Sequence, residues 1–322
     1  MNNFNEIYKN YRGVIDRELD SIDLPAELSY FRESLLYPLK GQGKRFRPIL
    51  LLTVGKSLGQ NEDQLMPAAL AIEILHTFTL VHDDIMDNDE MRRGLPTVHN
   101  KWDQPTAILS GDGLFALAYR QLMQLQLPVV NKITTRISDA LLKICEGQIR
   151  DLNFENRIDV LPQEYLDMVD LKTGELIGLS CAVGAIIAGA SEELIEKLNN
   201  FGKILGQAFQ IQDDILEISS DEEQMGKSLG SDFAAGKKTY PLTIILSKVD
   251  EEEKKNIMSF LQNNSYNKQE VMEKFEQYDA IQQGKALIDQ LISKALSELD
   301  GCPEHTKSQL RYFVELISNR EH

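Results

Sequence analysis

Cysteine is scarce in this chain: only three of its 322 residues are cysteines, and Cys145, Cys181 and Cys302 lie far apart. An odd number of widely spaced cysteines argues against a disulfide framework and against a cysteine-ligated zinc site. The first thirty residues are charged throughout and show no secretory signal. Together these features predict a protein of the reducing cytoplasm.

Long apolar runs are also missing. The most apolar stretch, 176–190, is shorter than the roughly 20 residues that cross a bilayer, and its three glycines suit a buried helix packed closely against neighbours. We therefore expect no stable membrane insertion. Positive charge is in the minority, with 34 Lys and Arg against 50 Asp and Glu and a net charge of −16. Such a surface repels nucleic acids and anionic membranes, so neither is an expected partner.

Proline is infrequent, with 10 residues, and the alternating Val, Thr and Tyr pattern of strands is scarce. Apolar residues instead recur every three to four positions, which predicts an all-α protein. The pattern predicts helices over residues 3–20, 26–40, 45–58, 64–88, 104–124, 131–152, 163–190, 192–220, 239–248, 251–262, 268–275, 279–299 and 303–319. Because no Gly/Ser/Pro-rich linker or tandem repeat divides the chain, we expect one helical domain over residues 1–322.

Two helical segments share one acidic design. In the first, Asp83 and Asp87 lie four residues apart with Asp84 between them, so Asp83 and Asp87 share a helix face. His76 lies on the same stripe. The opposite side of this segment carries the apolar residues Ile74, Phe78, Val81 and Ile85, which we expect to anchor it in the core.

The second acidic segment repeats this arrangement with Asp213, Asp214 and Glu217, where Asp213 and Glu217 share a face. Adjacent carboxylates repel one another, so a cation should compensate them. Magnesium suits such clusters because it prefers oxygen ligands and is commonly held by one or two carboxylates together with substrate phosphates. One such motif alone would be an ordinary acidic surface, but two in markedly apolar helices favour a site that clamps a diphosphate through metal ions.

Basic residues supply the counterpart. Lys44, Arg45 and Arg47 follow Gly43 at a helix entrance, where guanidinium groups can bind phosphate. Further clusters are Arg92-Arg93-Gly94, Lys172-Thr173-Gly174, and Lys227 with Gly236-Lys237-Lys238 in a glycine-rich loop, 225–238, that we interpret as a lid. Each cluster alone could be surface charge, but acids for metal and bases for phosphate together indicate one site.

In this order the motifs resemble those of the trans-isoprenyl diphosphate synthases, such as farnesyl and geranylgeranyl diphosphate synthases. The resemblance covers about residues 30–245 and runs through Gly43-Lys44-x-x-Arg47-Pro48, Asp83-Asp84-x-x-Asp87, Arg92-Arg93-Gly94, Lys172-Thr173, Gln210-x-x-Asp213-Asp214 and Gly236-Lys237-Lys238-Thr239. Weaker matches are Gly111-Asp112 and Glu146-Gly147-Gln148. One departure is Glu217, where the family commonly has aspartate, which puts a direct metal contact of Glu217 in doubt.

The resemblance implies a single large helical bundle of the isoprenoid synthase type, a deep central cavity and a homodimer. It implies that isopentenyl diphosphate binds at Gly43, Lys44, Arg47, His76 and Arg93, and that the allylic diphosphate binds at Arg92, Lys172, Thr173, Gln210, Lys227 and Lys237. Lys172, Thr173, Gln210, Arg92 and Lys237 would be catalytic. Three magnesium ions would be held by Asp83, Asp84, Asp87, Asp213, Asp214 and Glu217, with Asp84 in a supporting position.

The reaction implied is ionisation of an allylic diphosphate of C5 to C15, attack by the double bond of isopentenyl diphosphate, and loss of a proton. Bulky residues before the first acidic motif limit product length in the family. Here these are Leu75, Phe78 and Thr79, which favours geranylgeranyl over farnesyl diphosphate as the product.

Two other functions remain open. A class I terpene cyclase also uses an aspartate-rich helix, but its second motif usually mixes Asn, Ser or Thr with Glu, and it has no need of Lys44 and Arg47. A non-catalytic subunit of a heteromeric prenyltransferase is the second alternative, although such subunits typically lose the metal-binding acids, and both sets are present here.

Overall fold

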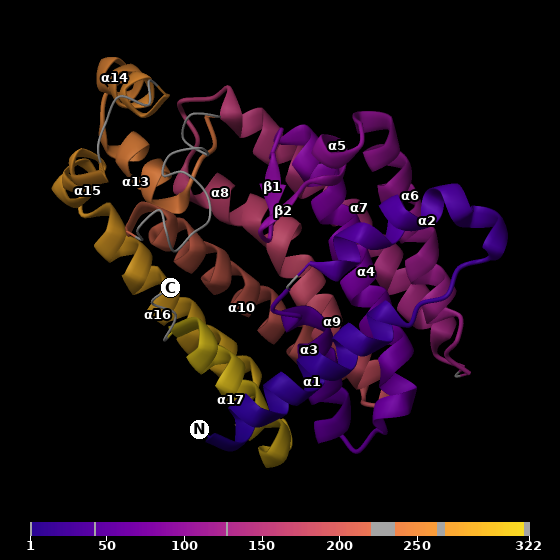
Figure 1. Ribbon diagram of the computed structural model, residues 1–322. Coiled ribbons are helices and arrows are strands. Elements are labelled where there is room, and N and C mark those ends of the chain that lie inside the picture. Colours follow the sequence, from indigo (N-terminus) through magenta and orange to yellow (C-terminus); the bar gives the residue numbers. More distant parts are fainter. Residues whose placement is uncertain (1, 42, 127, 220–235, 263–267, 319–322) are drawn as a thin grey trace. The chain divides into compact units, whose positions relative to one another are not determined.

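The computed structural model describes residues 2–41, 43–126, 128–219, 236–262 and 268–318 (Figure 1). These ranges are almost wholly helical, which confirms the all-α prediction. Their strands are confined to one two-stranded antiparallel hairpin, β1 (Met91–Arg92) and β2 (Leu95–Pro96).

The helices of the described ranges follow one another along the chain. They are α1 (Asn2–Asp20), α2 (Ser29–Leu36), α3 (Phe46–Ser57), α4 (Glu62–Met86), α5 (Val98–Lys101), α6 (Gln104–Leu122), α7 (Val130–Glu155), α8 (Pro162–Val169), α9 (Glu175–Ile187), α10 (Glu192–Ser219), α13 (Tyr240–Lys248), α14 (Glu251–Gln262), α15 (Lys268–Gln277), α16 (Ala280–Glu298) and α17 (Glu304–Ser318). Short 3-10 turns cover Ala26–Leu28 and Tyr37–Lys40, and a π-helix covers Asp170–Gly174.

The predicted helices agree with these bounds except at three places. The continuous helix expected over 26–40 is wrong, because α2 is flanked by two 3-10 turns and Pro38 lies inside the second. The helix expected over 163–190 is interrupted by the π-helix. The hairpin and α5 were not predicted at all, since two-residue strands carry too little periodicity to be recognised.

The chain divides into two compact units, each assembled from non-consecutive segments. The first contains residues 1–135, 180–195 and 303–309, and the second contains 136–179, 196–302 and 310–322. The single domain and the central cavity expected from the resemblance stay predictions.

In the first unit α4 is the core helix, and it packs against α3 and α6 (Figure 1). Ile74 and Val81 are buried as predicted, whereas Phe78 and Ile85 are only partly buried. Gly55 of α3 allows a close approach to α4, because a Cβ there would lie 2.3 Å from the Leu65 side chain. By length and apolar composition α4 could also cross a membrane, but 67% of its most apolar window is buried inside the protein, as in the core helix of a soluble protein.

In the second unit α10 packs closely against the segment that joins α8 to α9. A Cβ on Gly202 would lie 2.7 Å from the Cα of Gly178, and a Cβ on Gly206 would lie 2.8 Å from the Cα of Gly174. The backbones can approach this closely only because all four positions are glycine. α13 packs against α8 and α16 in the same unit. The consequence is that the Lys172-Thr173 segment is held directly against α10.

Candidate active site

The first acidic motif lies at the C-terminal end of α4. Asp83 and Asp84 occupy its last turn, Asp87 is its C-cap residue, and this last turn holds no basic residue. A helix C-terminus carries partial negative charge, so carboxylates there are at the unfavourable end of the macrodipole. The placement therefore calls for cationic compensation from outside the helix.

The first two aspartates of this motif differ in their surroundings. Asp83 is partly exposed, whereas Asp84 is 4% exposed and forms an ion pair with Arg92 of the hairpin at 2.5 Å. Burial raises the pKa of Asp84, although the Arg92 guanidinium opposes this. Arg92 also pairs with Asp89 at 2.9 Å. Asp84 thus ties Arg92 to the end of α4, in line with a supporting position for Asp84.

The hairpin presents its two arginines through a two-residue turn. Arg93 (φ 52°) and Gly94 (φ 77°) both have positive φ, which is the requirement of the turn that best joins two twisted strands. Gly43 leaves room for Arg93, since a Cβ there would lie 2.9 Å from the Arg93 Nη1 atom. Burial lowers the pKa of Arg93 below its ordinary value. The turn brings Arg93 to the loop that carries Lys44.

Of the three neighbouring cations Lys44, Arg45 and Arg47, Arg45 does not face outward. It is 4% exposed, and its guanidinium donates to Glu73 Oε1 at 2.6 Å, to Asp16 Oδ1 at 2.8 Å and to the Leu39 carbonyl at 2.8 Å. The interpretation of all three cations as phosphate ligands is therefore wrong for Arg45. Its guanidinium holds the loop in place from the buried side.

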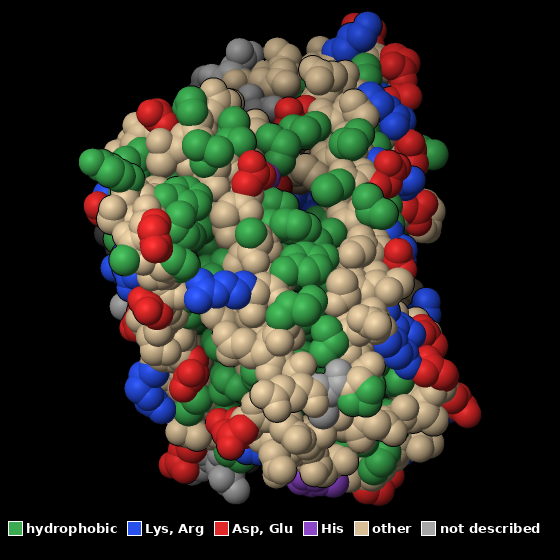
Figure 2. Space-filling view, turned by 90° about the vertical axis from the view of Figure 1, so that its right-hand side faces the viewer, with side chains coloured by type: hydrophobic (Ala, Val, Ile, Leu, Met, Phe, Trp, Pro, Cys, Tyr) green, Lys and Arg blue, Asp and Glu red, His purple; other side chains and the backbone are tan. Residues whose placement is uncertain are grey.

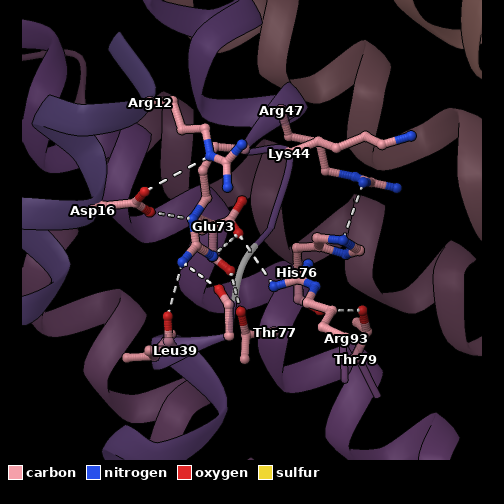
Figure 3. A network of polar contacts seen from close by, with 12 residues as sticks. Arg12, Asp16, Leu39, Lys44, Arg47, Glu73, His76, Thr77, Thr79 and Arg93 are labelled. Carbon is pink, nitrogen blue, oxygen red and sulfur yellow. Dashed lines mark hydrogen bonds and ion pairs between the residues drawn. The ribbon is translucent and has the colours of Figure 1, made fainter. Parts of the chain in front are cut away.

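Lys44 and Arg47 stay accessible on this support. Lys44 is exposed, and Tyr8 donates a hydrogen bond from its hydroxyl to the Lys44 carbonyl at 2.8 Å. Arg47 lies 3.1 Å from His76 Nε2, and Figure 3 shows the two side chains pointing toward each other. Since arginine only donates, His76 Nε2 is the acceptor. Burial and the neighbouring Arg47 and Arg93 hold the pKa of His76 well below its usual range, so the ring is neutral.

The structure thus brings Gly43, Lys44, Arg47, His76 and Arg93 into one region of the first unit, as predicted. Glu73 lies among them at 1% exposure, 4.0 Å from Arg93 Nη1 (Figure 3). Sequence reasoning missed Glu73, although a charged residue in the most apolar stretch of α4 was a usable signal. Its carboxylate anchors Arg45 and faces Arg93.

The residues predicted to limit product length precede the acidic motif on α4. Leu75 is buried, and Thr79 donates from its hydroxyl to the His76 carbonyl at 2.8 Å. The Phe78 ring packs edge-on against His82 (centroids 5.0 Å apart) and Phe115 of α6 (5.7 Å). Phe78 therefore belongs to an aromatic cluster that joins α4 to α6.

The second acidic motif lies near the C-terminal end of α10, which also lacks a basic residue in its last turn. Asp213 and Glu217 are partly exposed, whereas Asp214 is buried. Asp214 accepts hydrogen bonds from the Tyr165 hydroxyl (2.6 Å), the Tyr240 backbone N–H (2.9 Å) and the Gln210 amide (3.1 Å). Burial raises the pKa of Asp214 to about 7, and these three donors oppose that rise.

The two Asp-Asp pairs are alike: in each, the first aspartate is partly exposed, whereas the second is buried and accepts hydrogen bonds from other residues of the protein. Asp84 and Asp214 thus have partners within the protein, and the metal-binding role predicted for them stays a prediction. Asp214 joins α10 to α8 through Tyr165 and to the start of α13 through Tyr240. Tyr165 could not have been found from the sequence, because nothing in its local pattern indicates this partner.

Lys172 and Thr173 lie in the π-helix of the second unit. Lys172 Nζ is 2.5 Å from Asp151 Oδ2 on α7, and Thr173 donates from its hydroxyl to the Gln210 amide oxygen at 3.2 Å. Thr173, Gln210 and Asp214 consequently form one hydrogen-bonded chain. Of the residues predicted to be catalytic in this unit, Thr173 and Gln210 are hydrogen-bonded to each other, and Lys172, the neighbour of Thr173 in the chain, pairs with Asp151.

The segment before α13 is partly described. Lys237 is partly exposed, whereas Lys238 is 3% exposed and donates to the carbonyls of Gly236 (2.5 Å) and Glu155 (3.2 Å). Burial lowers the pKa of Lys238 to about 8. Lys227 and most of the expected lid, 225–238, lie outside the described residues.

Within the described part of the chain, no three His, Cys, Asp or Glu side chains form a ready-made metal site. Magnesium is commonly held by only one or two carboxylates plus phosphate oxygens. The donor chemistry within each unit fits magnesium: in the first unit Asp83 and Asp87 lie at a helix C-terminus, and in the second unit Asp213 lies near the C-terminal end of another helix, where positive charge is favourable.

Comparison with known proteins identifies the class. Residues 29–278 match the family model described as polyprenyl synthetase. The geranylgeranyl diphosphate synthase of Sulfolobus acidocaldarius is 42% identical over 275 residues, 84% of this chain and 82% of that protein. The short chain isoprenyl diphosphate synthase of Methanothermobacter thermautotrophicus is 38% identical over 98% of both chains. The chain belongs to the polyprenyl synthetase family, which confirms the resemblance to the trans-isoprenyl diphosphate synthases.

The fold agrees with a solved structure of the same family. The crystal structure of geranylgeranyl pyrophosphate synthetase from Pyrococcus horikoshii matches with a TM-score of 0.91 at 34% identity, covering 99% of this chain and 100% of that chain. This chain is accordingly an enzyme, a prenyltransferase with the all-α fold of that family.

Proposed function

We propose that this prenyltransferase condenses isopentenyl diphosphate with an allylic diphosphate of C5 to C15 and makes geranylgeranyl diphosphate. The observation that carries the proposal is the pairing of acid and base in each unit. In the first unit Arg92 pairs with Asp84, the neighbour of Asp83, and in the second unit Asp213 lies on a helix bonded to the Lys172-Thr173 segment. Curated relatives named geranylgeranyl diphosphate synthase support the product assignment.

Magnesium ions, when bound, would neutralise the diphosphate that leaves the allylic substrate. Asp83, Asp87 and Asp213 are the side chains that would hold them, with Glu217 in a less direct position. Arg92 and Lys172 would bind the oxygens of the same diphosphate, because each is a cation kept in place by a carboxylate of the protein. Their fixed positive charge would favour cleavage of the allylic C–O bond.

The other substrate, isopentenyl diphosphate, would bind to Lys44, Arg47 and Arg93. His76 is neutral and accepts from Arg47, so it orients that guanidinium without adding charge. Arg45 and Glu73 fix the loop beneath. This site distinguishes the proposal from a terpene cyclase, which uses one diphosphate substrate.

We further propose that two copies of the chain associate through α6. Its exposed stripe carries large apolar side chains at helical spacing, with exposures between 39% and 59%: Ile108, Leu109, Phe115 and Met123. Figure 2 shows apolar side chains gathered on one face of the molecule. Exposed apolar stripes of this kind mark protein interfaces. A Leu109→Asp variant should be monomeric when measured by light scattering, and an unchanged mass would exclude this surface.

The composition supports a cytoplasmic location for the reaction. The function is tested by incubating the purified chain with labelled isopentenyl diphosphate, magnesium and each allylic starter in turn. We expect geranylgeranyl diphosphate as the main product on chromatography. A cyclic hydrocarbon would indicate a terpene cyclase, and farnesyl diphosphate as the main product would indicate a farnesyl diphosphate synthase. If the chain alone gave no product, it would be a non-catalytic subunit.

A matched pair of variants tests the metal assignment. Asp83→Asn should lower kcat on the order of 100- to 1000-fold, because it removes a carboxylate that would act on developing charge. Asp63→Asn at the opposite end of α4 is exposed and should keep the wild-type rate. Near wild-type turnover of Asp83→Asn in magnesium, with both variants folded, would exclude Asp83 as a metal ligand.

A further inference from the structure

The segment that carries Lys172 and Thr173 has an unusual backbone. Residues Asp170–Gly174 form a π-helix between α8 and α9, and the Glu175 N–H donates to the Asp170 carbonyl five residues earlier. A π turn inserts one extra residue into an α-helix and is found frequently at functional sites. Something must hold it, because the α-helical hydrogen bonds are the more common arrangement.

One lysine of α10 bridges the two ends of this turn. Lys203 Nζ lies 2.8 Å from Asp170 Oδ2 and 2.5 Å from Glu175 Oε1. In an α-helix, residues five apart are turned by about 140° from one another, so a single amine would not reach both carboxylates. In this π turn both carboxylates reach the same Lys203 amine. The double ion pair therefore fits the π turn and would be lost in a regular helix.

Neighbouring groups reinforce the two carboxylates. Gln207 donates from its amide to Asp170 Oδ1 at 3.2 Å, and Lys143 of α7 lies 3.2 Å from Glu175 Oε1. The Glu175 side chain is only 7% exposed. The pKa of Lys203 is raised: burial lowers it, but the ion pairs with Asp170 and Glu175 outweigh the burial. Lys203 is thus charged and firmly held.

The turn is also enclosed on two sides by close backbone contacts. A Cβ on Gly147 of α7 would lie 2.6 Å from the Lys172 backbone nitrogen, and a Cβ on Gly174 would lie 3.1 Å from the Lys203 carbonyl. Lys203 therefore contacts the turn through its backbone and through its side chain. A shift of Lys203 would move the turn directly.

From these contacts we propose that Lys203 is a positioning residue, which holds the π turn so that Lys172 meets Asp151 on α7 while Thr173 meets Gln210 on α10. The inference rests on the proposed function, in which Lys172 and Thr173 bind the allylic diphosphate. A regular helix would rotate one of these two side chains away from its partner by about 100°. Lys203 itself touches no substrate.

The test compares Lys203→Met with Lys197→Met in the full-length enzyme. Lys197 lies on the same helix as Lys203. Its side chain donates at 3.2 Å to the carbonyl of Asp300, a residue that is far in sequence from the π turn. Lys203→Met should lower kcat/KM for the allylic substrate on the order of 100-fold, the effect of a small misplacement of a reacting group. The KM for isopentenyl diphosphate should stay unchanged, and Lys197→Met should match the wild type for both substrates.

Asp170→Asn provides a second variant if Lys203→Met does not fold, because it keeps the Glu175 ion pair and removes only one end of the bridge. It should show a smaller loss with the same selectivity for the allylic substrate, and Lys203→Arg should restore part of the activity. Wild-type kinetics in folded Lys203→Met, or equal losses for both substrates, would overturn the positioning role. Inactivity of the wild type would instead refute the proposed function.

Discussion

The buried ion pair that supports the loop carrying Lys44 makes a quantitative prediction. Arg45 and Glu73 meet at 2.6 Å with side-chain exposures of 3% and 1%. Glu73→Ala leaves the guanidinium of Arg45 in the interior with Asp16 as its remaining carboxylate partner. Breaking a buried pair by removing one partner costs about 3–5 kcal/mol, and the Asp16 contact places the expected loss near the lower end, about 3 kcal/mol.

This loss should be visible both in stability and in substrate binding. About 3 kcal/mol corresponds to a drop in Tm of about 4 °C for a chain of 322 residues. Arg45 also has a left-handed backbone (φ 52°), which is strained for a non-glycine residue and persists only while the surroundings hold it. Loosening Arg45 should therefore displace Lys44 and Arg47 and raise the KM for isopentenyl diphosphate more than that for the allylic substrate.

Thermal and urea unfolding followed by circular dichroism measure the first effect, and steady-state kinetics measure the second. The control is Arg32→Met, whose ion pair with Asp23 (3.3 Å) lies at the surface with exposures of 46% and 88%. A surface pair of this kind contributes about 0–1 kcal/mol. The double variant Arg45→Met/Glu73→Leu should recover much of the lost stability, since apolar replacements often equal a buried pair.

The reasoning fails if Glu73→Ala loses no more stability than Arg32→Met. It also fails if the KM for isopentenyl diphosphate stays at its wild-type value in a folded Glu73→Ala enzyme. In either case the pair would not be what holds the loop.

Three further outcomes follow from single side chains. Because the pKa of His76 is lowered in the folded protein, the unfolded chain binds a proton at His76 more readily. The free energy of unfolding should therefore fall as the pH drops below about 6.5. In a series of Tm measurements from pH 8 to 5, His76→Gln should reduce this fall. Phe78→Ala opens the cluster with Phe115 and should lengthen the products beyond C20 on chromatography; an unchanged product length would exclude Phe78 as the limit. Gly111→Ala should lower the free energy of unfolding by about 1–3 kcal/mol, because the new Cβ would lie 2.1 Å from the His82 ring. The effect is measured by thermal unfolding, and a wild-type Tm would contradict this packing.

The sequence by itself determined the helices, the acidic faces and the family. Periodicity of three to four residues gives the helix positions directly, since apolar residues must share one side of each helix to be buried. The spacing of Asp83 and Asp87 places both on one face of α4 in the same way. These properties are local, so the order of residues is enough to predict them.

Only the tertiary structure decided which charged groups face inward. The sequence pattern suggests that Arg45 is a phosphate ligand. In the structure its side chain is buried and pairs with Glu73, which lies 28 residues later in the chain. Asp214 gives no sign in the sequence of its buried partners, the Tyr165 hydroxyl and the Tyr240 backbone N–H. The π turn depends on Lys203, which lies 28 to 33 residues beyond its two carboxylates. A buried charge is stable only beside its partner, and such partners come together through folding, not through proximity in the chain.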